Sequence, residues 1–170
     1  MPKPFKIRNA QITDCAQILS LIKELAVYEK DPLAVKTTVA DLEEALFKGS
    51  HTFNNQPACF AVVIDDPENE KEICGFALYM LHFSTCTGKY GIYLEDLYVK
   101  ENKRGQGMGK ALLKYLAALC VEKGYARFEW WVLDWNTPAW DFYVSKGSIP
   151  MTEWTLHRMQ GQALKDLGTN

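Results

Sequence analysis

The run Arg104-Gly105-Gln106-Gly107-Met108-Gly109-Lys110 constrains this chain most, because it stands between a β-rich run and a strongly amphipathic helix. Glycines at alternate positions let the backbone turn tightly and present successive N–H groups to an anion. The helix behind the turn adds the positive end of its dipole and its unpaired first-turn donors. Arg104 and Lys110 can add charge-assisted contacts. The turn predicts a phosphate-binding site or, more plainly, only a tight strand-to-helix connection.

Two familiar phosphate-binding loops are excluded by the spacing of this run. A Walker-type loop requires Gly-Lys-Ser/Thr, whereas Gly109-Lys110 is followed here by Ala111. A dinucleotide fingerprint requires Gly-x-Gly-x-x-Gly near the first strand, whereas this run is Gly-x-Gly-x-Gly and begins after residue 100. The turn therefore needs a different partner from either of these two classes.

The periodicity of apolar residues predicts a mixed sheet with helices packed on it. An acidic run at 65–70 joins two of the strands as a hairpin and is expected to be a solvated loop tip. The expected strands cover residues 5–8, 59–65, 73–83, 92–99, 128–133 and 155–159. The expected helices run from the N-cap Thr13 to about Tyr28, from Thr38 to Gly49, from Met108 to near Gly124 and over 137–146, with a short amphipathic tail at 160–167.

Composition bounds the class of protein. The chain has 170 residues, 48% of them apolar and 24% charged, which fits one globular domain over residues 1–170. Its 19 basic and 21 acidic residues leave a net charge of −2, which argues against a nucleic-acid partner. The apolar runs are strand-sized, so we expect a soluble protein with no membrane partner. Five widely spread cysteines lack metal-ligand or redox spacing, which indicates reduced thiols, no metal and a cytoplasmic location.

Arg104-x-x-Gly107-x-Gly109 resembles the pyrophosphate loop, Gln/Arg-x-x-Gly-x-Gly/Ala, of the GNAT superfamily of acyl-CoA-dependent N-acyltransferases. It follows Tyr93-Leu94-Glu95-Asp96-Leu97-Tyr98-Val99, which is similar to the central strand of that fold. Residues 133–139 and Asp141-Phe142-Tyr143 resemble a second family signature. The resemblance extends from Ile7-Arg8 to Glu153-Trp154, and it points to the branch of spermidine/spermine (diamine) and thialysine acetyltransferases.

The resemblance implies an α/β (mixed α+β) fold and a co-substrate. The GNAT fold is a central twisted, mostly antiparallel sheet of six to seven strands, splayed beside the fourth strand and flanked by about four helices. Acetyl-CoA is the expected co-substrate, with its arm paired to the splayed strand like an added strand. Asn136 would anchor that arm from the other side, although it also fits a plain N-cap. The residues expected to hold acetyl-CoA are Leu97, Tyr98, Val99, Arg104, Gly105, Gln106, Gly107, Met108, Gly109, Lys110 and Asn136.

The resemblance also implies catalytic residues. A primary amine with a pKa of ~10.4 is mostly protonated at neutral pH and must lose a proton before it attacks. Glu95 resembles the general base, acting through a water, and Tyr143 resembles the general acid near the sulfur. A phenol on an amphipathic helix is by itself more often a core residue. Strand alternation sends Glu95 and Asp96 to opposite faces, so we predict a β-bulge within residues 94–97.

The expected acceptor is a small cationic amine, because carboxylates attract a cationic chain and aromatic faces hold ammonium groups. Ser84-Thr85-Cys86 occupies a loop where relatives often carry an aromatic residue, and Val144 and Ser148 also depart from the family pattern. Polyamines, short diamines, thialysine-like amino acids and small xenobiotic amines therefore all remain open. Thialysine carries a carboxylate that a wholly acidic pocket would repel. The residues that the resemblance places around the acceptor are Tyr28, Glu29, Asp96, Glu129, Trp130, Trp131 and Glu153.

The sequence thus predicts an acetyl-CoA-dependent N-acetyltransferase that acts by direct attack in a ternary complex. One alternative is a non-catalytic acyl-CoA-binding sensor, which needs the glycine turn but neither Glu95 nor Tyr143. Another is a protein or peptide N-acetyltransferase, which needs an open groove. The resemblance further implies a homodimer in which the C-terminal segment crosses between subunits.

Overall fold

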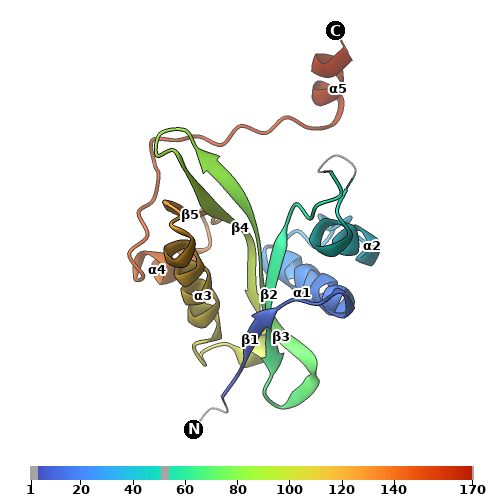
Figure 1. The fold of residues 1–170 in the computed structure, drawn as a ribbon, viewed down its shortest axis with the longest axis vertical. Helices are drawn as coiled ribbons and strands as arrows, with labels where there is room; N and C mark the ends of the chain where they lie inside the picture. Colours follow the sequence, from blue (N-terminus) through green and yellow to red (C-terminus); the bar gives the residue numbers. More distant parts are fainter. Residues whose placement is uncertain (1–3, 51–53, 170) are drawn as a thin grey trace. The chain divides into compact units, whose positions relative to one another are not determined.

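The computed structural model describes residues 4–50 and 54–169, which form two compact units, Met1–Trp131 and Val132–Asn170 (Figure 1). The expectation of one domain over residues 1–170 stays a prediction.

The first unit is built on one sheet of five strands in the order β1-β2-β3-β4-β5. The three pairings from β1 to β4 are antiparallel, and β4 pairs with β5 in parallel. A mostly antiparallel mixed sheet is therefore confirmed. The strands are β1 (Ile7–Asn9), β2 (Phe60–Asp66), β3 (Asn69–Ser84), β4 (Lys89–Val99) and β5 (Arg127–Trp130).

The expected count of six to seven strands is wrong for the residues that the structure describes, which form five. Residues 155–159, expected as the last strand, have no regular secondary structure, and all are exposed. A strand is held by the ladder it makes with a neighbour, and no described segment supplies one here. The fifth strand also ends early, at Trp130 rather than at residue 133.

Helices cover both faces of the sheet in the first unit. α1 (Cys15–Tyr28) and α2 (Val39–Glu43) lie on one face, and α3 (Met108–Lys123) lies on the other (Figure 1). Short turns flank these helices: the 3₁₀ turn η1 (Ile12–Asp14) leads into α1, the π-helical turn η2 (Glu44–Lys48) continues α2, and the 3₁₀ turn η4 (Glu101–Lys103) precedes the glycine turn. In the second unit lie α4 (Thr137–Val144) and α5 (Gly161–Thr169).

The start of α1 differs from the sequence expectation, because Asp14 rather than Thr13 is its N-cap. The Asp14 carboxylate is buried and accepts hydrogen bonds from Arg8 at 2.7 and 3.1 Å and from the N–H of Gln11 at 2.7 Å. Burial opposes ionisation, but these bonds hold the pKa of Asp14 below its usual value. Arg8 also donates to Asp65 at 2.8 Å, so one guanidinium joins β1, β2 and the start of α1.

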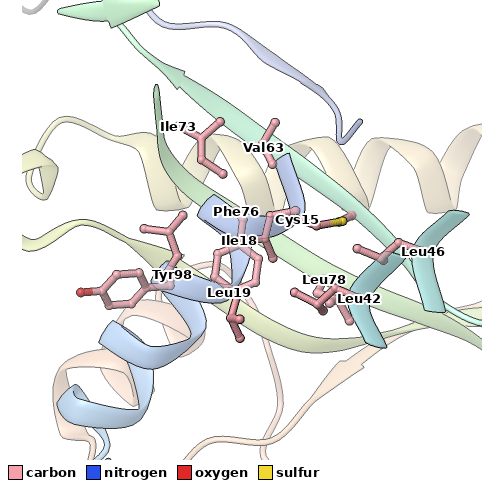
Figure 2. Close-up of a cluster of buried hydrophobic side chains, with 12 residues drawn as sticks. Cys15, Ile18, Leu19, Leu42, Leu46, Val63, Ile73, Phe76, Leu78 and Tyr98 are labelled. Carbon is pink, nitrogen blue, oxygen red and sulfur yellow. The ribbon is translucent and has the colours of Figure 1, made fainter. Parts of the chain in front are cut away.

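The core lies between α1, α2 and the sheet (Figure 2). Phe76 and Ile18 are fully enclosed at its centre, and Leu42 and Leu46 close it from α2 and η2. Thr38 caps α2 with the expected capping box, in which its hydroxyl accepts from the N–H of Asp41 at 3.2 Å. The face of the sheet that carries this core is called the α1 face below.

The acidic hairpin between β2 and β3 is not simply a solvated tip. Asp66 is buried, and its carboxylate lies 2.8 Å from the ammonium of Lys103, which also contacts Glu68. Burial alone would raise the pKa of Asp66. The Lys103 ammonium and a backbone N–H outweigh this effect and hold the pKa of Asp66 below its usual value. This pair fastens η4, the segment just before the glycine turn, to the β2–β3 hairpin.

Candidate active site

β4 carries the predicted bulge. In the pairing with β3, Asp96 stands opposite Leu78 and Leu94 stands opposite Tyr79, so Glu95 is the additional residue between them. Residues directly opposite each other share a face, and Leu78 belongs to the core on the α1 face. Asp96 therefore projects to the α1 face, while Leu94 projects to the α3 face. The bulge thus places two acidic residues in succession where regular alternation allows only one.

Three carboxylates gather on the α1 face at this bulge. Burial, followed by the charges of Glu95 and Glu29, raises the pKa of Asp96 to about 7. Burial also raises the pKa of Glu29, which is the C-cap of α1. The three groups therefore form a strongly negative region in which Asp96 exchanges a proton near neutral pH, as groups that hold a cation or move a proton commonly do.

The sheet is open beside this bulge. β5 pairs with β4 only from Gly91 to Leu94, and no described strand pairs with that side of β4 beyond Leu94. The carbonyl of Tyr98 points toward β3, since it lies 3.1 Å from where a Cβ on Gly75 would stand. Because backbone groups alternate along a strand, those of Leu97 and Val99 point to the open side. The predicted splay beside the fourth strand is therefore present, with Leu97 and Val99 on its open edge, where the Val99 carbonyl already accepts a hydrogen bond from Arg104 Nε at 3.1 Å.

The glycine turn leads into α3 without a side-chain cap. Gly105 and Gly107 have φ of 77° and 81°, in the left-handed region that favours glycine. Gly107 is the N-cap of α3 and has no side chain with which to satisfy the first-turn N–H groups. These donors and the helix dipole remain for an anion, and the exposed Lys110 follows in the first turn.

Arg104 is placed differently from the contact that the sequence suggested. Its guanidinium stacks between two aromatic rings, 4.8 Å from the Tyr28 centroid and 5.2 Å from the Tyr98 centroid. Its Nε donates to the carbonyl of Val99 at 3.1 Å, and the Tyr98 hydroxyl reaches Glu24 at 3.3 Å. Arg104 therefore connects the glycine turn to β4 and to the end of α1, and its role toward the pyrophosphate stays a prediction.

The α1 face continues beyond the bulge toward the tip of the β3–β4 hairpin. Met80, Tyr93 and Glu129 stand opposite one another, and so share this face. Trp131 packs edge-on against Tyr93, with ring centroids 5.5 Å apart. The structure thus brings Glu129 and Trp131 to the face that carries Asp96. Trp130 instead packs against Phe128, 4.9 Å between centroids, on the opposite face.

Two residues of this face were not singled out from the sequence. His82 lies over Gly91, and its Nε2 is 3.0 Å from Glu129 Oε2 but out of line for a hydrogen bond. The guanidinium of Arg127 lies 3.7 Å from the other oxygen of Glu129. Their spacing along the chain carries no motif, and only the register of the strands brings them together.

The remaining predicted site residues lie in the second unit. Asn136 is buried and caps α4, its side-chain oxygen accepting from the N–H of Ala139 at 3.4 Å. Tyr143 is half-buried in the last turn of α4, beside the Phe142 ring. Glu153 is exposed in a turn closed by a hydrogen bond from the N–H of Trp154 to the carbonyl of Met151, at 3.2 Å. The roles of all three stay predictions.

Two further properties concern the described residues alone. No helix among them is both long enough and apolar enough to cross a bilayer. Their His, Cys, Asp and Glu side chains form no group of three or more that could hold a metal ion.

Comparison with known proteins identifies the family. The sequence profile of the Acetyltransferase (GNAT) family matches residues 22–147. The chain therefore belongs to the GNAT acetyltransferase family, an enzyme family that uses acetyl-CoA as co-substrate. Within the family it is similar to the thialysine N-epsilon-acetyltransferase of Sus scrofa, 40% identical over 167 residues and 95% of each chain. The Caenorhabditis elegans protein of the same name is 32% identical over 95% of this chain and 96% of that protein.

The chain is also similar to a longer protein, of which it spans a part, and to solved structures at lower sequence identity. The spermidine/spermine N(1)-acetyltransferase-like protein 1 of Homo sapiens is 33% identical over 96% of this chain, which spans 24% of that longer protein. Among solved structures, an integron cassette protein from Vibrio cholerae superposes with a TM-score of 0.78, at 24% identity and 98% coverage of both chains. An aminoglycoside acetyltransferase from a soil metagenome, in complex with sisomicin, has a TM-score of 0.71 at 22% identity, covering 92% of this chain and 95% of that one. These two structures show the shared fold.

Proposed function

We propose that this acetyltransferase transfers the acetyl group of acetyl-CoA to a primary amine of a small cationic acceptor: a polyamine, a diamine or a thialysine-like amino acid. The observation that carries the proposal is the bulge in β4, which puts Glu95 and Asp96 on one face, in a negative region shared with Glu29. A cationic amine is attracted to such a region, and the similarity to thialysine and polyamine acetyltransferases supports the same class of acceptor.

Acetyl-CoA would be held by the open edge of β4 and by the glycine turn. The backbone groups of Leu97 and the N–H of Val99 offer hydrogen bonds to an extended arm, as an edge strand does for an added strand, whereas the Val99 carbonyl is bonded to Arg104. The uncapped N-terminus of α3 behind Gly107 suits the pyrophosphate. We propose that Asn136 holds the arm from the other side, in addition to capping α4.

The reaction would be a direct attack in a ternary complex. The acceptor ammonium loses a proton to Glu95, through a water, and its nitrogen then attacks the thioester carbonyl carbon. The C–N bond forms and the C–S bond breaks. The CoA thiolate takes a proton from Tyr143, and the acylated nitrogen releases its second proton through water, which restores the Tyr143 phenol. Asp96, with a pKa of about 7, holds part of the negative charge that draws the ammonium in.

Purified protein mixed with acetyl-CoA and a panel of amines tests this proposal, with the release of free CoA thiol as the readout. We expect thiol release with at least one small polyamine, diamine or basic amino acid, and none without an acceptor. Tight CoA binding with no turnover on any amine would instead support a sensor. Turnover confined to peptides would support a protein acetyltransferase, a function that no feature of the described residues favours.

We also propose that the protein is a cytoplasmic homodimer whose C-terminal segment packs against a second copy. Segment 149–167 exposes apolar side chains that a monomer leaves in water, with Ile149 81%, Trp154 77% and Leu167 67% exposed. The five cysteines are free, in keeping with a reducing compartment. Sedimentation equilibrium should give a dimer mass for the full chain, and a monomer after truncation behind Ser148.

A further inference from the structure

The α1 face carries a second charged cluster beyond the acidic residues of the bulge. On β3, Leu78, Met80 and His82 alternate onto the same face. Leu78 marks the level of Asp96, Met80 the level of Glu129, and His82 the level of Arg127. We refer to Glu129, Arg127 and His82 as the distal cluster.

The charges of the distal cluster are mixed, unlike those at the bulge. Glu129 is the only carboxylate in it, and Arg127 flanks that carboxylate at 3.7 Å. His82 lies on the other side, with its enclosed Nε2 at 3.0 Å from Glu129 but not aligned for a hydrogen bond. The contacts are loose, and the side chains of Arg127 and Glu129 are 42% and 43% exposed, so both can be reached by a ligand.

The spacing between the two clusters matches a particular kind of molecule. A strand rises ~3.4 Å per residue, so Glu129 lies roughly 7 Å along β3 from the level of Asp96, and Arg127 lies about 7 Å farther. An extended chain of six bonds spans about 7 Å, which is the separation of the terminal and α-nitrogens in lysine and thialysine. An amine with its terminal nitrogen at Glu95 and Asp96 would therefore bring its other end to Glu129.

On the basis of the proposed function, we propose that the distal cluster recognises the α-amino acid end of the acceptor. Glu129 binds the α-ammonium and Arg127 binds the α-carboxylate, while His82, with its Nε2 enclosed 3.0 Å from Glu129 Oε2, positions the Glu129 carboxylate. Arg is suited to this role because its planar guanidinium matches a carboxylate. A polyamine or diamine has no carboxylate, so it gains nothing from Arg127 and meets its positive charge.

Gly91 explains how His82 reaches this place. A Cβ on Gly91 would lie 2.4 Å from His82 Nε2, so the imidazole can lie across β4 toward β5 only over a glycine. Tyr93 and Trp131, stacked edge-on between the two clusters, offer apolar surface to the methylene chain of the acceptor. The arrangement therefore has a polar group for each charged end and aromatic surface for the middle.

The test compares acceptors that differ only in the carboxylate. Lysine is set against cadaverine, its decarboxylated counterpart, and against lysinamide, which lacks only the negative charge. The measurement is kcat/KM from CoA thiol release, for the wild-type protein and for Arg127→Gln, His82→Gln and Lys114→Gln. Lys114 lies exposed on α3 and controls for the loss of one positive charge.

We expect the wild-type protein to prefer lysine over lysinamide and cadaverine, and Arg127→Gln to reduce that preference about 10-fold or more, mainly through KM. His82→Gln reduces it less, and Lys114→Gln leaves it unchanged. Because the preference is a ratio within one protein, a loss of folded protein does not alter it.

Two outcomes overturn the inference in distinguishable ways. If amines are acetylated but the preference is absent, or is the same in Arg127→Gln as in wild type, the distal cluster does not read the carboxylate and the proposed function stands. If no amine releases CoA thiol, the proposed function fails and the distal cluster fails with it.

Discussion

The guanidinium of Arg104 lies 4.8 Å from the centre of the Tyr28 ring, so the first residue of the glycine turn rests on the end of α1. Tyr28 and its neighbour Glu29 belong to the expected acceptor site, whereas the glycine turn belongs to the expected acetyl-CoA site. One side chain thus connects the two halves of the proposed active site.

Arg104→Gln should therefore weaken the binding of both substrates and lower the stability of the fold. Loss of the stacking and of the bond to the Val99 carbonyl should cost about 1–2 kcal/mol of unfolding free energy. The KM should rise for the amine as well as for acetyl-CoA. Lys110→Gln, in the same turn, is the matched control: it should raise only the KM for acetyl-CoA and leave the melting temperature unchanged. Equal melting temperatures for both variants would contradict this role of Arg104.

Tyr143→Phe should lower kcat by ~100-fold or more, as expected when a general acid is removed. The affinity for CoA, measured by calorimetry, should change little because the ring remains. Tyr115→Phe removes a phenol hydroxyl from α3 and should leave kcat unaltered. Unchanged turnover in Tyr143→Phe would remove this residue from the mechanism.

The two glycines of the turn should respond differently to alanine. Gly107 has a φ of 81°, so Gly107→Ala is strained by about 1–2 kcal/mol and distorts the N-terminus of α3. Gly109 lies within α3, and a Cβ there would meet only Leu97, at 3.9 Å. Gly109→Ala should keep or slightly raise the melting temperature, and it should preserve the KM for acetyl-CoA that Gly107→Ala raises. Similar kinetics for the two variants would argue against the turn as an anion site.

The pH dependence of stability should report on Asp96. Its folded pKa of about 7 exceeds its unfolded value, so ionisation destabilises the fold. The wild-type protein should therefore match Asp96→Asn near pH 4 and lose stability relative to it as the pH rises to about 7. The difference should reach on the order of 2–4 kcal/mol. Urea unfolding at pH 4.5 and pH 8 measures it, with Asp31→Asn, at an exposed aspartate, as the matched control.

Local patterns predicted most of the elements, because each depends on residues close in the chain. The capping box at Thr38 and the glycine after α3 mark helix ends through short-range bonds, and both stand where expected. Thr13 was a wrong N-cap because Asp14 is held by Arg8, from a different element. The strand expected at 155–159 was wrong because alternation does not supply a partner.

The residues of the candidate site also fall into those that the sequence could predict and those that it could not. Glu95 and Asp96 could be predicted from the sequence. The bulge could be predicted as well, because two consecutive side chains lie on one face of a sheet only where the strand is irregular. The distal cluster could not, because His82, Arg127 and Glu129 come from separate strands and meet only through their register. Nor could the stacking of Arg104 between Tyr28 and Tyr98, which depends on how α1 ends beside β4.

One inserted residue in β4 gives this strand an acid for which regular pleating has no place. With Glu95 removed, Leu94 and Asp96 would follow each other on opposite faces, as their partners Tyr79 and Leu78 already do, so Tyr93 and Leu97 would also keep their faces. The insertion therefore adds the proposed base without changing which side of the sheet its neighbours occupy. A shortened strand would retain the acceptor surface and the open edge of β4, but it would lack the group proposed to take the proton.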